Sequence, residues 1–307
     1  MRGVTVGGKA PRVVEGRRQR RGVARDTRVK VSSAERASGV GSGSTAADRY
    51  VAMNRFRVQE RKEGADAKFE KRWAERPSRL ATMDGFRWFA LFRRVNRDGS
   101  PLDEEAHADY NYTSMTLWED KETFKVWREG DVFKEAHGGG NIKGILDMLI
   151  SSAQTLKGKP KLLLANAYKT SSVSVSESDL PKMAGGWREL VADGVNLLEP
   201  ECFMAANDFV VTSGQEEAFL EEANAKIIEK ARTFPGFRFG TVLNADNNSS
   251  EEGDVYATAT VWDDQASWEA FAGEDGAKAG VSKNVAAKDP FPRYFEGKLV
   301  LTTQKGA

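Results

Sequence analysis

The sequence predicts an α+β fold in which two copies of a split βαβ domain follow each other along the chain. Motifs of the first half recur, in the same order, in the second half. Each copy has the alternation and periodicity expected for the order βαββαβ. The length of 307 residues is sufficient for two domains of ordinary size. The expected domains cover residues 49–170 and 201–307, and a linker with a short helix covers residues 171–200.

Five matched segments carry the internal repeat. They are Asn54–Val58 with Asn207–Val211, Gly64 and Phe69 with Gly214 and Phe219, Gly85–Arg87 with Gly236–Arg238, Thr116–Asp120 with Thr260–Asp264, and Lys161–Leu164 with Lys298–Leu301. A period this long that occurs only twice does not fit a solenoid. Each copy is therefore expected to fold as a domain.

The first copy begins with a strand and a helix. Side chains alternate in character over Val51–Val58, which predicts a strand. Residues Ala65–Arg76 are rich in Ala, Lys, Glu and Arg and carry a Phe and a Trp four positions apart. This pattern predicts an amphipathic helix, which Pro77 would stop.

A hairpin and a second helical region follow. Phe86–Val95 and Tyr110–Trp118 predict two strands, joined by the polar loop Asn96–Glu105. Asp120 is expected to cap a helix that reaches Trp127. The pair Gly130-Asp131 predicts a break, after which Asp131 would cap a second short helix.

The first copy closes with a glycine run, a helix and a strand. Gly138–Gly140 is expected to break the chain, Ile142–Ala153 to form a helix and Lys161–Tyr168 to form the last strand. The second copy predicts the same order, with elements at Cys202–Val211, Glu216–Thr233, Phe237–Leu243, Val255–Trp262, Gln265–Ala272 and Gly297–Thr302. This order is that of the ferredoxin-like fold.

An open sheet of this kind has one face that its own helices do not cover, and apolar side chains there need a partner. Two copies in one chain can pack sheet to sheet, because a short linker raises their local concentration to about millimolar or more. We therefore expect an intramolecular dimeric α/β barrel in a monomeric protein. In the linker a helix is expected around Trp187–Asp193, and the acidic stretch Asp246–Asp254 is expected to be an exposed loop.

The first 48 residues differ in composition from the rest. They carry nine arginines against four acidic residues, and no aromatic residue precedes Tyr50. Such a segment cannot bury enough apolar surface to offset its ordering entropy. Its Arg-rich, Ser-containing, acid-poor composition is typical of an organelle transit peptide, and its many small residues favour the chloroplast over the mitochondrion. A basic arm that stays attached is the alternative.

The whole-chain totals exclude several classes of function. The net charge of +1 gives no strong field for nucleic acid, and no apolar run is long enough to span a bilayer. There is one cysteine, Cys202, and there are two histidines, His107 and His137, so a metal site built from several histidines is excluded. His107 lies among acidic residues and is expected to be solvated.

The first copy resembles the antibiotic biosynthesis monooxygenase superfamily and, within it, the IsdG-like haem-degrading monooxygenases. The resemblance covers residues 53 to about 168 and rests on Asn54–Val58, Thr116–Glu119 and the run Phe124–His137. In that family an Asn, a Trp and a His form the haem site. These residues fall here on Asn54, Trp127 and His137, with the His ten positions after the Trp as in the family.

The resemblance implies a role for each residue. His137 would bind the haem iron, for which neutral imidazole is a suitable axial donor. The glycines from Gly138 onward would let a flat macrocycle approach the backbone. Trp127 would press on the porphyrin, and Asn54 would donate a hydrogen bond to dioxygen on the opposite side of the iron. Arg55 or Arg57 could pair with the haem propionates; the sequence leaves this open.

The implied reaction is oxidative opening of the porphyrin with release of iron, so that haem is both cofactor and substrate. It needs dioxygen and an external reductant. No nucleotide-binding glycine fingerprint is present, so electrons would come from a separate donor such as a ferredoxin or a reductase. Aligned on Trp118 and Trp262, the second copy has Phe271 in place of Trp127 and Val281 in place of His137. Since valine cannot bind iron, one haem per chain is expected.

Each of these residues also has a purely structural interpretation. His137 could be a solvated histidine at a helix C-terminus, Trp127 a core residue and Asn54 a strand residue bonded to backbone. Two other functions also fit the sequence. One is a cofactor-free monooxygenase of the same superfamily that acts on a small aromatic substrate. The other is a haem carrier or sensor that leaves haem intact.

Overall fold

A computed structural model describes most of the chain after residue 45. The described residues are 46–59, 63–76, 79–102, 109–136, 153–173, 183–184, 187–188, 194–250, 253–273, 280–286 and 288–302. His107, His137, Gly138 and most of the helix expected at Ile142–Ala153 lie outside them. Among the described helices, none is both long and apolar enough to cross a membrane.

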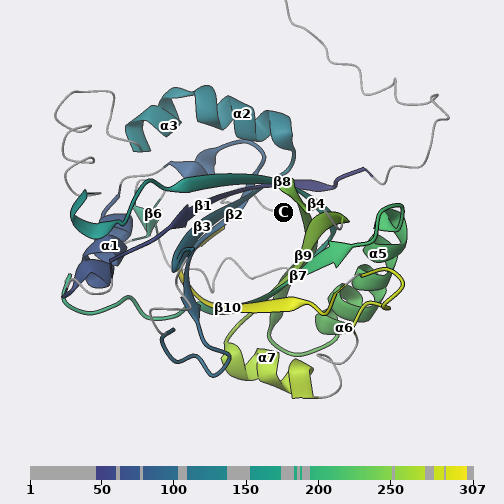
Figure 1. Cartoon of the computed structure of the whole chain (residues 1–307). Helices are drawn as coiled ribbons and strands as arrows, with labels where there is room; N and C mark the ends of the chain where they lie inside the picture. The colour runs from purple at the N-terminus through teal and green to yellow at the C-terminus, as the bar shows by residue number, and fades with distance from the viewer. Residues whose placement is uncertain are drawn as a thin grey trace, which may run out of the picture. The chain divides into compact units, whose positions relative to one another are not determined.

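Eight antiparallel strands close into a barrel, which Figure 1 shows end-on. The strands of the first copy are β1 (Arg49–Phe56), β2 (Phe86–Val95), β3 (Tyr112–Trp118) and β4 (Lys161–Ser172). Those of the second copy are β7 (Cys202–Val211), β8 (Phe237–Ser250), β9 (Gly253–Trp262) and β10 (Phe291–Thr302). The order around the barrel is β1-β3-β2-β10-β7-β9-β8-β4.

Each copy contributes four consecutive strands of the barrel. The two quartets, β4-β1-β3-β2 and β10-β7-β9-β8, have the same order, and they join where β2 pairs with β10 and β4 with β8. The last strand of each copy thus pairs with the second strand of the other. The expected pair of ferredoxin-like domains, packed as an intramolecular dimeric α/β barrel, is confirmed, and no sheet edge of the barrel is left open.

The helices lie on the outside of the barrel. Their bounds are α1 Ala65–Ala74, η1 Leu80–Thr82, α2 Lys121–Glu129, α3 Asp131–Ala136, α5 Glu216–Ala223, the π-helical turn η3 Asn224–Ile228, α6 Glu229–Arg232 and α7 Gln265–Phe271. Asp120 caps α2 as predicted, since its side chain accepts a hydrogen bond from Thr123 N at 2.8 Å. Asp264 caps α7 in the same way through Ser267 N.

Aromatic contacts between the helices and the sheet repeat from one copy to the other. Phe69 of α1 lies 4.9 Å from Tyr112, and Phe219 of α5 lies 5.2 Å from Tyr256, between ring centroids. Trp118 lies 5.3 Å from Trp127, and Trp262 lies 5.1 Å from Phe271. Both copies therefore pack their helices on the sheet in the same way, around large aromatic rings.

One of the five predicted repeat pairs is wrong. In β1 Asn54 faces Leu162, whereas in β7 Asn207 faces Pro292, so Lys161–Leu164 corresponds to Phe291–Tyr294 and not to Lys298–Leu301. The bulges of the two last strands agree with this alignment, because Lys169 and Leu299 both have positive φ, 50° and 55°.

The predicted start of the last strand, Gly297, is therefore six residues late. Two prolines, Pro290 and Pro292, interrupt the strand pattern in the first half of this strand, because proline disfavours a central strand. Pro292 is accommodated because β10 pairs there with β7 alone, and its pairing with β2 begins only at Tyr294.

Two expectations for irregular segments are also wrong. Trp187–Arg188 forms the short strand β6 and pairs with β5 (Met183–Ala184), so no helix begins at Trp187. Most of Asp246–Asp254 is not a loop, because β8 continues to Ser250 and β9 begins at Gly253. Backbone pairing between the two strands extends the hairpin despite the acidic side chains.

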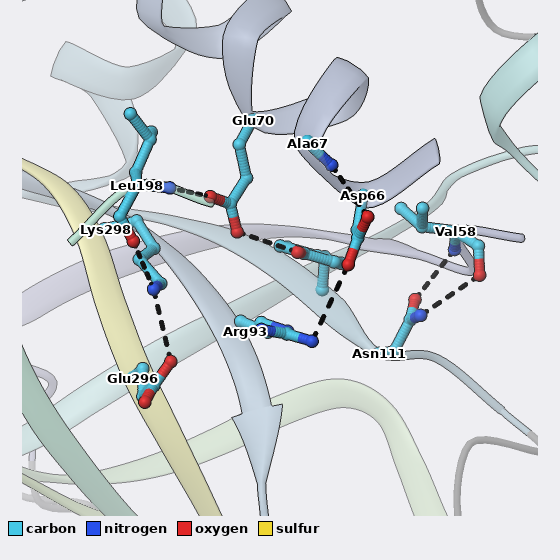
Figure 2. A network of polar contacts seen from close by, with 10 residues as sticks. Val58, Asp66, Ala67, Glu70, Arg93, Asn111, Leu198, Glu296 and Lys298 are labelled. Atoms are coloured by element: carbon cyan, nitrogen blue, oxygen red, sulfur yellow. Dashed lines mark hydrogen bonds and ion pairs between the residues drawn. The ribbon is translucent and has the colours of Figure 1, made fainter. Parts of the chain in front are cut away.

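A buried polar network attaches α1 to the barrel (Figure 2). Glu70 of α1 is 0 % exposed; its Oε1 accepts a hydrogen bond from Tyr112 Oη at 2.8 Å, and its Oε2 accepts one from Leu198 N. Lys298 of β10 is 2 % exposed, donates from Nζ to Leu198 O and pairs with Glu296 at 3.2 Å. Burial raises the pKa of the Glu70 carboxyl, although Lys298 and the Tyr112 hydrogen bond lower it in part. The network joins both copies.

Cys202 is expected to be unreactive in the folded protein. It is buried on β7, and burial raises the pKa of its thiol to about 12, so the reactive thiolate is scarce at neutral pH. Labelling by an aromatic disulfide reagent should be at least about 100-fold slower in buffer than in denaturant. Because the chain has one cysteine, the released chromophore reports this thiol alone. Rapid labelling of the native protein would contradict this burial.

Candidate functional site

Asn54 lies on the helix-facing side of β1. Tyr50, Ala52 and Phe56, which share its face, belong to the cluster of buried residues beneath α1 and α2. Phe56 contacts Phe69 of α1 at 5.2 Å, and Tyr50 contacts Phe124 of α2 at 5.4 Å, between ring centroids. Asn54 therefore occupies the part of β1 between the points where two helices are anchored.

The Asn54 side chain is half-buried and has no hydrogen-bond partner within the part of the chain that the structure describes. Its cross-strand neighbours on the same face are Ser114 of β3, which is buried, and Leu162 of β4, which is 49 % exposed. An amide beside an exposed apolar side chain can donate from Nδ2 to a ligand that covers both. No backbone group among the described residues bonds to the Asn54 side chain.

Trp127 of α2 is partly buried against the same cluster of residues. Its ring lies 5.3 Å from Trp118, 5.9 Å from Phe124 and 4.9 Å from Phe133. The predicted break is confirmed: α2 ends at Glu129, Gly130 is the C-cap and α3 begins at Asp131. Phe133 of α3 thereby contacts the Trp127 ring in a T-shaped arrangement. The indole packs against the core and stays partly accessible.

His137 and Gly138 follow directly after α3, which ends at Ala136, and both lie outside the described residues. The structure brings Asn54 and Trp127 to the same, helix-covered side of the sheet. α2, which carries Trp127, packs on β1 and β3. Along the chain, Asn54 therefore lies on β1, Trp127 lies on α2, and His137 follows directly after α3.

The second copy has a cavity of about 80 Å³ at the position that corresponds to this site. Asn207 and Phe271, the counterparts of Asn54 and Trp127, both line it, together with Thr258, Thr260 and Tyr294. The Asn207 side chain has no hydrogen-bond partner among the described residues. Val281, the counterpart of His137, is partly buried against a neighbouring cluster. The described lining of this cavity has no charged side chain and no histidine.

The inside of the barrel carries a group of charged side chains, which sequence reasoning did not bring together. Arg55 and Asp208 follow Asn54 and Asn207 and so point to the opposite face, into the lumen, where Arg293 of β10 joins them. Asp208 forms an ion pair with Arg293. Arg55 thus faces away from Asn54, which removes it as a partner for propionates on the helix-covered face. Strand alternation, applied to the residue after each Asn, could have placed Arg55 and Asp208 on the inner face, but it does not show that they meet Arg293.

Burial raises the pKa of the Asp208 carboxyl, although Arg293, Arg55 and Arg94 lower it. The ionised form of Asp208 is therefore less favourable in the lumen than in water, and the arginines offset only part of this cost. Among the described residues no group of three or more His, Cys, Asp or Glu side chains could hold a metal ion. The described part of the site thus offers amide and aromatic groups on one face of the sheet and guanidinium groups on the other.

Comparisons with known proteins agree with the fold. The family profile of antibiotic biosynthesis monooxygenases matches residues 49–139 and 202–283. A proposed monooxygenase from Fusobacterium nucleatum superposes with a TM-score of 0.52 at 11 % identity, over 86 % of this chain and 97 % of that one. One from Lactobacillus acidophilus gives 0.50 at 7 % identity, over 83 % and 96 %. No curated protein sequence matches the chain. At such low identity the structural matches concern the fold alone.

Proposed function

This chain belongs to the antibiotic biosynthesis monooxygenase family, and from that premise we propose that it is a monooxygenase that binds haem and opens the porphyrin ring. The observation that carries the proposal is the side chain of Asn54, an amide with no partner among the described residues, on the sheet face that α2 covers with Trp127. The chain then runs through α3 directly to His137.

The residues of the first copy suit haem in three respects. The aromatic rings of Trp127 and Phe133 and the exposed Leu162 offer apolar contacts for a flat macrocycle. His137 would supply an imidazole, a donor that suits haem iron. The glycine run from Gly138 has no side chains to obstruct the approach of the ring. In the second copy Val281 offers no donor, which favours one haem per chain.

Haem, when bound, supplies the redox chemistry with dioxygen, and the electrons come from a separate donor. The chain supplies the positioning groups. His137 would hold the iron through an imidazole nitrogen. Asn54 would donate a hydrogen bond from Nδ2 to a ligand bound at the site. Trp127, held by Trp118 and Phe133, would contact the macrocycle.

The test begins with titration of the full chain with hemin, followed by a reductant in air. We expect a Soret band that saturates at one hemin per chain, then bleaches while an iron chelator traps ferrous iron. Without hemin uptake, turnover of an activated phenol by the same chain would favour the cofactor-free monooxygenase. Uptake of hemin without bleaching would overturn the catalytic part of the proposal in favour of a carrier or sensor.

Asn54→Leu is expected to retain hemin but to slow its bleaching about 100-fold, because one preorganised donor is lost. Asn207→Leu is the matched control, since it changes the corresponding residue of the second copy and should leave the bleaching rate unchanged. Equal rates for the two variants would remove Asn54 from the catalytic role.

We also propose that residues 1–48 direct the protein to the chloroplast. The support is their composition, which combines nine arginines with small residues and few acids. A fluorescent protein fused behind residues 1–48 should enter plastids, whereas the same fusion with the arginines replaced by glutamine should stay in the cytosol. Import into mitochondria instead would show that the segment directs the protein to that organelle.

A further inference from the structure

The barrel lumen is filled at one end and hollow at the other. Val51, Leu117, Phe239 and Val261 belong to the apolar cluster that packs the inside of the barrel. Toward the opposite end lies a cavity of about 50 Å³, to which seven of the eight strands contribute side chains. On the same scale one water molecule needs roughly 10–15 Å³, so the cavity has room for a molecule of several heavy atoms.

The mouth of this cavity has more positive than negative groups. Arg55 and Arg293 line it, against the carboxylate of Asp208, which pairs with Arg293. Among the described residues Arg55 has no carboxylate within ion-pairing distance, and its guanidinium lies 4.7 Å from the centroid of the Tyr110 ring. Two guanidinium groups against one carboxylate leave the described lining with an excess of one positive charge.

Part of this hydrogen-bonding capacity is unused. The guanidinium of Arg55 is half-buried and has no counterion among the described residues, which is unfavourable for a partly desolvated charge. Only 17 % of the Arg293 side chain is exposed, and it pairs with Asp208. An anion in the cavity that accepts hydrogen bonds from Arg55 would supply the missing counterion.

The deeper wall of the cavity is apolar. Met53, Met115, Leu163, Leu243 and Phe295 line it below the arginines. A ligand that matches both parts carries one negative charge at one end and a short hydrocarbon at the other. Inorganic phosphate matches less well, because it has no apolar part and carries more negative charge than the excess of one.

We propose that the charged end of the barrel lumen binds a small organic carboxylate, with its head on Arg55 and Arg293 and its tail toward Met115 and Leu163. Arginine forks match carboxylates in geometry as well as in charge. The site lies on the opposite face of β1 from Asn54 and is independent of the proposed haem chemistry. It is also formed by both copies, since Arg55 comes from the first and Asp208 and Arg293 come from the second.

The test is calorimetric titration of the full chain with butyrate, compared with uncharged butyramide and with inorganic phosphate. Butyrate should bind at least about tenfold more tightly than either, as expected for a charge-assisted hydrogen bond worth about 1.4 kcal/mol or more. Equal binding of butyrate and butyramide, or no binding of butyrate, would overturn the proposal. Tighter binding of phosphate would replace the carboxylate with a phosphate ligand.

Three variants locate the site. Arg55→Gln should weaken butyrate binding about tenfold or more, whereas Arg55→Lys, which keeps the charge, should retain most of it. Arg57→Gln is the matched control, because it removes the same charge two residues along the chain from a side chain that does not line the cavity. Far-ultraviolet circular dichroism checks that each variant is folded. Unchanged binding in Arg55→Gln, or the same loss in Arg57→Gln, would contradict the assignment.

Discussion

The full chain with His137→Ala is expected to take up hemin at least about 100-fold more weakly and to lose its bleaching activity. An axial ligand should contribute more than the outer groups around a metal site, whose removal typically costs 10–100-fold in affinity. The measurement is the Soret titration, followed by reduction in air. The wild-type position of the band reports an imidazole-bound iron, and that signature should disappear in the variant.

Two controls separate ligation from a structural effect of this substitution. His107→Ala removes the only other histidine of the chain and should leave uptake and bleaching unchanged. Free imidazole added to His137→Ala should restore the spectrum in part, since a small donor can occupy the vacated position. Normal uptake by His137→Ala would leave the proposed haem site without its ligand and refute it.

Glu70→Ala is expected to lower the free energy of unfolding by about 3 kcal/mol, because two buried donors lose their acceptor and each unsatisfied buried group costs roughly 1–3 kcal/mol. The substitution removes the acceptor for Tyr112 Oη and for Leu198 N, whereas Lys298 keeps its ion pair with Glu296. Denaturant unfolding followed by tryptophan fluorescence measures the change, at constant slope, as a shift of the midpoint.

Glu75→Ala is the matched control on the same helix. Glu75 is exposed and pairs at 3.1 Å with Lys71, so its loss should change the free energy of unfolding by no more than about 0.5 kcal/mol. Glu70→Gln keeps a carbonyl oxygen as acceptor and should lie between the two. A Glu70→Ala protein as stable as the Glu75→Ala protein would show that the buried network contributes nothing to stability.

The pH dependence of stability has a defined sign at Glu70. Because burial raises the pKa of this carboxyl above its ordinary value of 4.5, the folded protein binds the proton more tightly than the unfolded chain does. The stabilisation from this group is complete below pH 4.5 and is lost as the pH rises through the folded-state pKa. Unfolding curves of Glu70→Gln, measured from pH 4 upward, should lack this loss and fall less steeply than those of the wild type.

The local rules of the sequence were sufficient wherever one segment decides its own structure. The cap at Asp120, the break at Gly130 and the strand Phe86–Val95 follow from side-chain chemistry and periodicity within a few residues. Similarly, the repeat predicted that two copies would share one fold. Local rules failed at Phe291–Arg293, because the nearby prolines argue against a strand there. The structure accommodates Pro292 since this part of β10 pairs with β7 alone.

The candidate site divides in the same way. Asn54 and Trp127 could be selected from the sequence because they match the motif of the family that the first copy resembles, and the strand and helix periods place each on a face of its element. The lumen site could not, because Arg55 lies more than 150 positions from Asp208 and more than 230 from Arg293. Only the register between strands of different copies brings those side chains to the same end of the barrel.

The sequence by itself determined the α+β class, the two copies and the positions of most helices and strands, and it predicted Asn54 and Trp127 as site residues. These properties depend on neighbours along the chain, and neighbours are what a sequence displays. The tertiary structure alone decided the closure of the barrel through β2–β10 and β4–β8, the buried link from Glu70 to Lys298 and the charged cavity in the lumen. Their free energies arise from contacts between distant segments, which exist only once the chain has closed on itself.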